Sequence, residues 1–222
     1  MAIEAVLFDI DGTLLLTGGA GAVAWQRAFA ELWGVEANIG EHTHAGMTDP
    51  EIVEMVFEEV IGRPGSDEEH ERAMAGYLAH LGDAVAESRG YRVMPGVEQT
   101  LGRLSGEGIL LGLVTGNVEP AARIKLARAG LDRFFGFGGY GSDSRDRTEL
   151  TRRAVQRGGE VRGTPLPPEA TIAIGDTPRD IWAGHGAGIR VVGVATGAYS
   201  VAQQRRAGAD WAIPTVLDGL PV

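Results

Sequence analysis

The period of the apolar positions changes along the chain. Residues 3 to 9 form a short, mostly apolar run without a helical stripe, and this run ends on Asp9. Such a run is typical of a buried parallel strand at the start of a sheet. From about residue 22 to residue 33, the large side chains of Trp25, Phe29 and Trp33 recur at helical spacing, which predicts an amphipathic helix.

Helix-start signals continue through the next part of the chain. Thr48 with Glu51, and Ser66 with Glu69, match the capping box, in which a hydroxyl and a carboxylate satisfy free backbone amides at a helix start. We therefore expect residues 15 to 90 to be entirely helical.

From residue 94 onward, expected helices and strands alternate. This alternation predicts an α/β fold with a doubly wound parallel sheet. A glycine-rich segment in this part matches GxGxxG, but it lacks the strand, helix and acidic residue that surround a dinucleotide fingerprint, so we expect a loop. The pattern places helices at 97 to 107 and 119 to 129, strands at 109 to 115, 171 to 175 and 190 to 194, and the glycine-rich loop at 136 to 141.

The two patterns together predict a core and an insertion. We expect residues 1 to 14 and 91 to 222 to form the α/β core, and residues 15 to 90 to form a helical cap inserted after the first strand. A length of 222 residues with 44% hydrophobic composition is enough for one core domain with a smaller insertion.

Composition narrows the partners and the chemistry. A formal net charge of -10 argues against nucleic acid as a partner, because most of the surface would repel phosphates. The chain has no cysteine, which excludes disulfides, thiolate zinc sites and cysteine nucleophiles. The first residues lack a secretory signal and no apolar run could span a bilayer, so we expect a cytoplasmic protein without a membrane partner. The sequence leaves the oligomeric state open.

Three of the expected strands end in polar residues. In open α/β sheets the carboxyl ends of strands meet at one crevice, so these groups should come together. Paired carboxylates raise each other's pKa and need a cation among them, and a set of oxygen ligands without histidine or cysteine suits Mg²⁺. The expected Mg²⁺ ligands are Asp9, Asp11 and Asp176. The full set of strand-end residues is Asp9, Asp11 and Thr13 after the first strand, Thr115, Gly116 and Asn117 after the second, and Asp176 and Asp180 after the third.

Three segments of the chain resemble the motifs of the haloacid dehalogenase superfamily, in its phosphoglycolate-phosphatase-like branch. Residues 6 to 13 match hhhhDxDGT, residues 111 to 117 match a hydrophobic strand that ends in threonine, and residues 172 to 180 match hhhhGDxxxD. The motifs keep the family's order, and the helical stretch lies where many members insert a mobile cap. Three motifs in order, each ending an expected strand, form a specific combined signal.

The resemblance implies a role for each aspartate. Asp9 would be the nucleophile that forms an aspartyl-phosphate, and Asp11 would be the general acid and later the base, with its backbone carbonyl on the metal. Asp176 would bind Mg²⁺ directly. Asp180 would hold a metal-bound water or orient its neighbours, although an aspartate here also suits a purely structural helix start.

Other residues would hold the substrate. The resemblance implies that Thr115, with the amides of Gly116 and Asn117, binds the phosphoryl oxygens. Thr13 belongs to the first motif, and Thr48 lies in a segment that resembles the cap loop touching substrate in relatives. We expect both among the substrate-binding residues.

The family has one more motif, its third, which lies between the second and the last of these segments, and there this chain departs from the family pattern. The family commonly has a lysine before a proline there, whereas the only lysine of this chain, Lys125, lies in the middle of an expected helix. Arg147, which opens a later helix, is our candidate for the missing cation, and Arg145 is the rival. Arginine keeps the charge but forms forked contacts that need not copy those of lysine.

The predicted function is a Mg²⁺-dependent phosphatase for a small phosphorylated metabolite, with a phosphoglycolate-like phosphomonoester as the leading candidate by resemblance. A sugar-phosphate mutase of the same fold, or a catalytically inactive binding protein, stays open as an alternative. Four arginines of the cap region could contact a substrate carboxylate, namely Arg63, Arg72, Arg89 and Arg92.

Overall fold

Six parallel strands form the sheet in the computed structural model, which describes residues 2–36 and 38–222. Their order across the sheet is β5-β4-β1-β6-β7-β8, which places β1 at the centre and reverses the direction of chain progression beside it. This is the α/β architecture that the alternating pattern predicts. The strands are β1 (Ala5–Phe8), β4 (Leu110–Val114), β5 (Phe137–Gly139), β6 (Thr171–Gly175), β7 (Arg190–Val194) and β8 (Trp211–Ile213).

Successive residues of β1 pack on opposite faces of the sheet. Phe8 joins the apolar cluster that also contains Leu101 and Leu126, on the side of α4 (Val97–Gly106) and α5 (Glu119–Ala127). Leu7 joins a second cluster with Ala154 and Ile181, on the side of α6 (Arg147–Arg162) and α7 (Pro178–Gly186). Because both faces are covered, all four residues of β1 are buried, which explains its uniformly apolar sequence.

The prediction of a loop at residues 136 to 141 is wrong at Phe137–Gly139, where β5 runs parallel to β4. Gly138 and Gly139 give this strand no apolar alternation. The backbone of α6 approaches closely at this point: a Cβ on Gly139 would lie 1.8 Å from the carbonyl oxygen of Leu150. Glycine therefore permits the contact between the strand and the helix, and propensity alone does not reveal it.

The C-terminal part completes the sheet with elements that the pattern does not predict. Strand β8 pairs with β7, and the short helix α8 (Val201–Arg206) connects them. In the described part of the chain, four short 3-10 turns lie at Ile39–Glu41, Asp132–Phe134, Pro168–Ala170 and Val216–Asp218.

The inserted helices have an apolar cluster of their own. Both capping boxes are confirmed, at Thr48 and at Ser66. A stacked pair lies at the centre of the cluster, with the rings of Trp25 and Tyr77 4.0 Å apart and 2° from parallel. These helices are α1 (Ala20–Trp33), α2 (Asp49–Met55), a π-helical segment that continues α2 (Val56–Ile61), and α3 (Asp67–Glu87).

The expectation that residues 15 to 90 are entirely helical is wrong at its start. Leu15–Leu16 form strand β2, which pairs antiparallel with β3 (Arg92–Val93). The chain thus enters and leaves the helical insertion through a two-stranded ribbon. Met94 extends this ribbon by donating its backbone N–H to the carbonyl oxygen of Leu14 at 2.9 Å.

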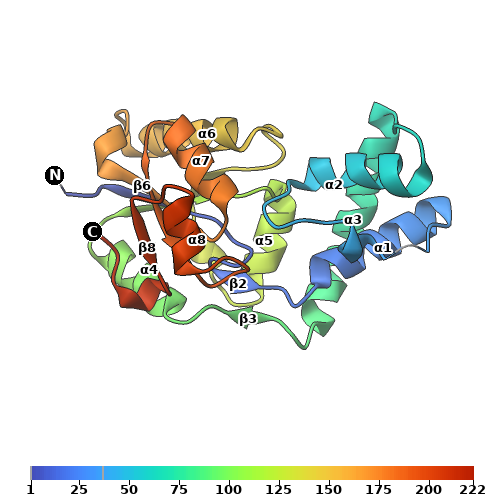
Figure 1. Cartoon of the computed structure of the whole chain (residues 1–222), viewed down its shortest axis with the longest axis horizontal. Coiled ribbons are helices and arrows are strands. Elements are labelled where there is room, and N and C mark those ends of the chain that lie inside the picture. The colour runs from blue at the N-terminus through green and yellow to red at the C-terminus, as the bar shows by residue number, and fades with distance from the viewer. Residues whose placement is uncertain (1, 37) are drawn as a thin grey trace.

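Figure 1 shows the resulting arrangement. The sheet and its covering helices form one half, and α1, α2 and α3 form the other half, with α5 lying between them. Both termini lie at the end of the molecule that is remote from the inserted helices. Within residues 2–36 and 38–222, every helix is too short or too polar to cross a membrane.

Candidate functional site

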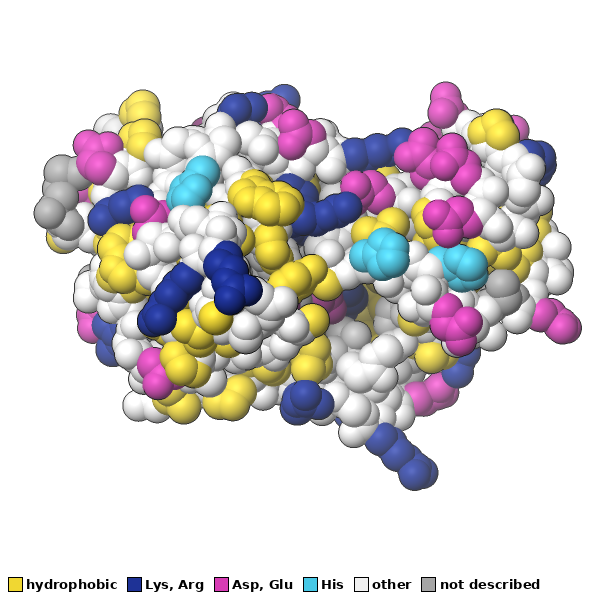
Figure 2. Space-filling view, viewed as in Figure 1, with side chains coloured by type: hydrophobic (Ala, Val, Ile, Leu, Met, Phe, Trp, Pro, Cys, Tyr) yellow, Lys and Arg dark blue, Asp and Glu magenta, His cyan; other side chains and the backbone are white. Residues whose placement is uncertain are grey.

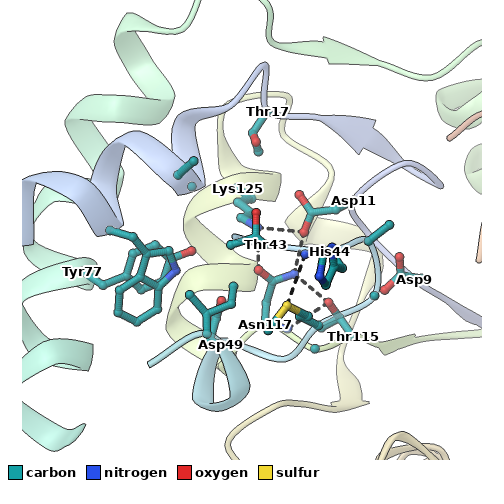
Figure 3. Close-up of a pocket in the computed structure, with 18 of the residues that line it drawn as sticks. Asp9, Asp11, Thr17, Thr43, His44, Asp49, Tyr77, Thr115, Asn117 and Lys125 are labelled. Atoms are coloured by element: carbon teal, nitrogen blue, oxygen red, sulfur yellow. Dashed lines mark hydrogen bonds and ion pairs between the residues drawn. The ribbon is translucent and has the colours of Figure 1, made fainter. Parts of the chain in front are cut away.

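A cavity of about 210 Å³ lies where the carboxyl ends of β1 and β4 face the inserted helices. The sheet contributes Asp9, Asp11 and Thr115, and the insertion contributes its lining from α1, α3 and the segment around residues 43 to 52. Figure 3 shows these groups facing one another across the cavity, with Tyr77 on the opposite side from Asn117 and Lys125. The strand-end residues therefore meet at one crevice, as their positions predict.

Asp9 follows β1 directly and is held there by the sheet. Its backbone N–H donates to the carbonyl oxygen of Ile174 in β6 at 2.9 Å. Its side chain is buried, and the Arg147 guanidinium lies 3.3 Å from the Asp9 Oδ1 atom. Burial, together with Asp180 and Asp176, holds the pKa of Asp9 well above its usual value despite Arg147.

Asp176, which follows β6, lies in a tight cradle of glycines. A Cβ on Gly12 would lie 2.4 Å from its Oδ2 atom, and a Cβ on Gly197 would lie 1.8 Å from the same atom. Thr13 donates its hydroxyl to the Asp176 Oδ1 atom at 3.2 Å. Burial, and then the neighbouring Asp180, raise the pKa of Asp176 to about 7. Thr13 therefore positions Asp176 and does not line the cavity.

Both carboxylate oxygens of Asp180 already have partners. Its Oδ2 atom accepts hydrogen bonds from the backbone N–H and the hydroxyl of Thr177, at 3.0 and 2.7 Å, at the start of α7. Its Oδ1 atom accepts a hydrogen bond from the Arg147 guanidinium. Asp180 thus starts a helix and fixes the arginine at the same time.

Three carboxylates converge behind the cavity. Oxygen atoms of Asp9, Asp176 and Asp180 all lie within 4.8 Å of one another, and all three residues are buried. The side chain of Asp11 takes another direction, toward α5. Such a cluster of like charges disfavours joint ionisation and needs positive charge, of which Arg147 supplies one unit.

Asp11 forms a network with Asn117 and Lys125 that sequence reasoning missed. Asn117 Nδ2 and Lys125 Nζ donate to the Asp11 Oδ2 atom at 2.8 and 2.7 Å, and Lys125 also donates to Asn117 Oδ1 at 2.5 Å. The lysine is buried, yet its pKa is raised, because the attraction of Asp11 and Asp49 outweighs the effect of burial. One sequence signal pointed to this residue, since Lys125 is the only lysine in an arginine-rich chain.

Thr115, Gly116 and Asn117 form the turn after β4, and all three line the cavity. The Thr115 hydroxyl accepts hydrogen bonds from the backbone N–H and the side-chain amide of Asn117, at 3.2 and 2.7 Å. This hydroxyl is fully buried at the strand end. The Thr115 N–H donates to the carbonyl oxygen of Gly139 and the Asn117 N–H donates to Thr115, so the turn offers the Thr115 hydroxyl and the Gly116 N–H as donors for an anionic group beside Asp9.

The cap loop that was expected to touch substrate is docked on this turn. Thr48 does not line the cavity, and its hydroxyl accepts the backbone N–H of Glu51 at the start of α2. The next residue, Asp49, belongs to the same expected cap loop and lines the cavity. Its backbone N–H donates to the carbonyl oxygen of Gly116, and its Oδ2 atom accepts the N–H of Val118, both at 2.8 Å.

The structure separates the two candidate arginines. Arg147, the first residue of α6, is buried in the cluster and also donates from Nη1 to the carbonyl oxygen of Gly46 at 3.4 Å. Its Nε atom is buried without a hydrogen-bond partner among the described residues. Arg145 is exposed and pairs with Glu54 of α2 at 2.5 Å, outside the cavity.

Comparison with known proteins shows the family of the chain. The chain is 28% identical over 206 residues to "Probable phosphatase IndB" of Dickeya dadantii, covering 91% of this chain and 85% of that protein. It is 28% identical over 199 residues to a phosphoglycolate phosphatase of Agrobacterium fabrum, covering 86% and 80% of the two chains. The fold matches that of CbbY from Rhodobacter sphaeroides, solved in complex with phosphate, with a TM-score of 0.73, 23% identity and coverage of 96% and 94%. The family model for haloacid dehalogenase-like hydrolases matches residues 3–188, and the chain therefore belongs to that family.

Proposed function

We propose that this protein is a Mg²⁺-dependent phosphatase that acts on small phosphomonoesters through an aspartyl-phosphate at Asp9. One observation carries the proposal: Asp9 and Asp11 both line the same small cavity, one beside Arg147 and the other beside Lys125. Two carboxylates in different surroundings suit the two different tasks of a nucleophile and a proton donor.

In the first step, a carboxylate oxygen of Asp9 attacks the phosphorus, and the bond between phosphorus and the leaving oxygen breaks. Asp11 gives its proton to that oxygen, and an alcohol leaves. In the second step, water attacks the phosphorus while Asp11 takes a proton from it. The bond between Asp9 and phosphorus breaks, which regenerates the carboxylate and releases phosphate.

The turn after β4 supports the binding of the phosphoryl group. Thr115, Gly116 and Asn117 line the cavity beside Asp9, and the Thr115 hydroxyl and the Gly116 N–H would meet the oxygens on which charge develops. The buried Nε of Arg147 is a further donor that lacks a partner in the described part of the chain. Unpaired buried donors are costly unless a ligand satisfies them, so this atom also favours an anionic ligand.

The acidic cluster fits a hard divalent cation. Its donors are carboxylate oxygens alone, and the glycine cradle fixes Asp176 close to Asp9. We propose Asp9 and Asp176 as direct ligands with the backbone carbonyl of Asp11, and Asp180 as the residue that orients Arg147 beside them. A bound Mg²⁺ would neutralise the phosphoryl group and polarise it toward attack.

The cavity size supports a small substrate, because a space of about 210 Å³ under helices admits a metabolite but excludes a folded protein. Relatives named phosphatases support the reaction class, and phosphoglycolate is the first ester to test because one of these relatives carries that name.

The experiment is a panel of small phosphomonoesters, with and without Mg²⁺, for the wild type and Asp9→Asn. The proposal expects release of phosphate from several esters by the wild type, and loss of turnover in a variant that melts at the wild-type temperature. Comparable turnover in a folded Asp9→Asn variant would remove the proposed nucleophile.

A further inference from the structure

The cap side of the cavity is apolar and aromatic. Trp25 and Tyr77 are each 1% exposed, and their stacked rings form one wall. No lysine or arginine of the cap belongs to this wall in the described part of the chain, and the polar cap residues that line the cavity beside it are Thr17, Thr43, His44 and Asp49. The cap residues that complete it with small or aliphatic surfaces are Gly19, Gly21, Ala22 and Ile52.

The basic groups near the cavity are already paired. Among the described residues that line it, only Lys125 and Arg147 are lysine or arginine, and both belong to the core. Lys125 is held by Asp11, and Arg147 is held by Asp9 and Asp180. A substrate carboxylate at the cap side would therefore meet no unpaired lysine or arginine among the described lining residues, and His44 is the cap side chain there that can be protonated.

The cap arginines that were candidates for a carboxylate contact lie elsewhere. Arg63 pairs with Glu69, and Arg72 lies over the Trp33 ring. Arg89 and Arg92 are exposed, and none of the four lines the cavity. On the face shown in Figure 2, acidic side chains gather over the cap half of the molecule. Exposed acidic residues of the cap include Glu58, Glu59, Asp67, Glu68 and Glu71.

Negative charge is already present at the leaving-group end. Asp49 is buried in the cavity wall near Asp11, and burial raises its pKa to about 6 against the opposing effects of Lys125 and the Val118 N–H. A carboxylate on the substrate would add a third anion to this region. Like charges in a buried site disfavour one another, so this end of the cavity should reject an anionic leaving group.

The wall formed by Trp25 and Tyr77 nevertheless contains a polar group, the Tyr77 hydroxyl, that indicates a ligand. The Tyr77 hydroxyl makes no hydrogen bond with any residue in 2–36 or 38–222, although the side chain is almost wholly buried and faces the cavity (Figure 3). Burial, with Asp49 and Asp11 nearby, holds the pKa of Tyr77 well above its usual value, so the hydroxyl stays protonated. An uncharged hydroxyl on the substrate would satisfy it.

We infer that the substrate is a phosphomonoester of a small uncharged alcohol that carries a further hydroxyl, which Tyr77 binds over the Trp25 ring. This inference rests on the proposed phosphatase function and narrows its substrate class. It sets this chain apart from enzymes for phosphoglycolate, whose leaving alcohol, glycolate, carries a carboxylate.

The test compares four esters of nearly equal size: 2-hydroxyethyl phosphate, 2-phosphoglycolate, O-phosphoethanolamine and ethyl phosphate. They share a phospho-O-CH2 unit and differ in the group attached to it, which would face Tyr77 and is a hydroxymethyl, a carboxylate, an ammoniomethyl or a methyl group. We expect kcat/KM for 2-hydroxyethyl phosphate to exceed that for phosphoglycolate by at least about tenfold, and that for ethyl phosphate by about tenfold.

Tyr77→Phe should bring the ratio between 2-hydroxyethyl phosphate and ethyl phosphate close to one. Tyr199→Phe removes a hydroxyl that does not line the cavity and should keep the wild-type ratio. A preference for phosphoglycolate or phosphoethanolamine, or an unchanged ratio in Tyr77→Phe, would overturn the inference and leave the phosphatase function standing. Absence of turnover for all four esters and for p-nitrophenyl phosphate would overturn both.

Discussion

Lys125 donates a hydrogen bond to Asp11 from 114 positions further along the chain, with 2.7 Å between Nζ and Oδ2. The lysine side chain is 7% exposed and the aspartate side chain 42% exposed, so a buried cation fixes a carboxylate that reaches the cavity. In the proposed mechanism, this contact orients the proton donor toward the leaving oxygen. Lys125 would then be a positioning residue that acts through Asp11.

Lys125→Met should therefore lower turnover most for substrates that need a proton donor. We expect a loss of about tenfold to a hundredfold in kcat for an alkyl phosphate, which is part of what general acid catalysis contributes. p-Nitrophenyl phosphate has a leaving group that departs without a proton and should lose much less. Equal losses for both substrates would show that Lys125 does not act through Asp11.

The second prediction separates the two arginines of the third-motif region. Arg147→Ala leaves Asp9 and Asp180 buried without their cation, which should destabilise the protein by about 3 kcal/mol and abolish most activity. Arg145→Ala removes only an exposed pair with Glu54, worth less than about 1 kcal/mol.

Chemical denaturation and phosphatase assays of both variants would check this ranking. Arg147→Lys keeps the charge, so it provides a folded variant for the assay if the alanine variant does not fold. Greater damage from Arg145→Ala than from Arg147→Ala would overturn the assignment of Arg147.

The third prediction concerns pH and metal together. The pKa values of Asp9, Asp49 and Asp176 are raised in the folded protein, to about 6 for Asp49 and about 7 for Asp176. A raised carboxyl pKa means that the folded state binds protons more tightly than the unfolded state. Stability of the metal-free protein should therefore increase as pH falls from about 8 to about 5 through these values.

Thermal melting in the presence of a chelator would measure this trend, and Mg²⁺ should reduce it by stabilising the ionised cluster at the upper end of the range. Asp176→Asn, which removes one titrating group from the cluster, should have a flatter profile. A metal-free protein that loses stability steadily as pH falls through this range would contradict the prediction.

The fourth prediction uses two glycines with similar backbone angles. Gly12 has a φ of 88° and lies against Asp176, whereas Gly108 has a φ of 78° with open space where a side chain would be. Gly108→Ala should cost about 1 kcal/mol of backbone strain and keep activity. Gly12→Ala should cost more and also displace Asp176.

The Mg²⁺ concentration that supports half-maximal activity would test the difference. We expect Gly12→Ala to raise it by more than about tenfold, because second-layer contacts of this kind tune metal affinity by ten- to a hundredfold. Gly108→Ala should leave it unchanged. An equal shift in both variants would show that strain alone, and not the position of Asp176, controls metal binding.

The sequence predicts the fold class and the meeting of the strand ends because both depend on local patterns. β1, β4 and β6 are apolar runs that end in polar residues, and parallel strands bring such ends to one edge. β5 could not be predicted in this way, since its glycines are required by the approach of α6 and not by strand propensity.

The roles of Lys125, Asp49 and Tyr77 were also beyond local patterns. Each lies on a helix whose sequence gives no sign of the opposing surface, and the contacts join positions far apart in the chain. Lys125 reaches Asp11 from α5, Asp49 reaches Val118 from the cap, and Tyr77 faces the cavity from α3. Only the tertiary arrangement of cap and core brings these side chains together.

The most direct test of the central claim is to trap the phosphorylated enzyme. Wild-type protein mixed with Mg²⁺ and an excess of a turned-over phosphomonoester, quenched in acid during steady state and digested, would be mapped by mass spectrometry. The account predicts a phosphoryl group on Asp9, and none in Asp9→Asn treated in the same way. A phosphoryl group on another residue would contradict the account. So would an unmodified Asp9 in an Asp11→Asn enzyme that still releases p-nitrophenol from p-nitrophenyl phosphate.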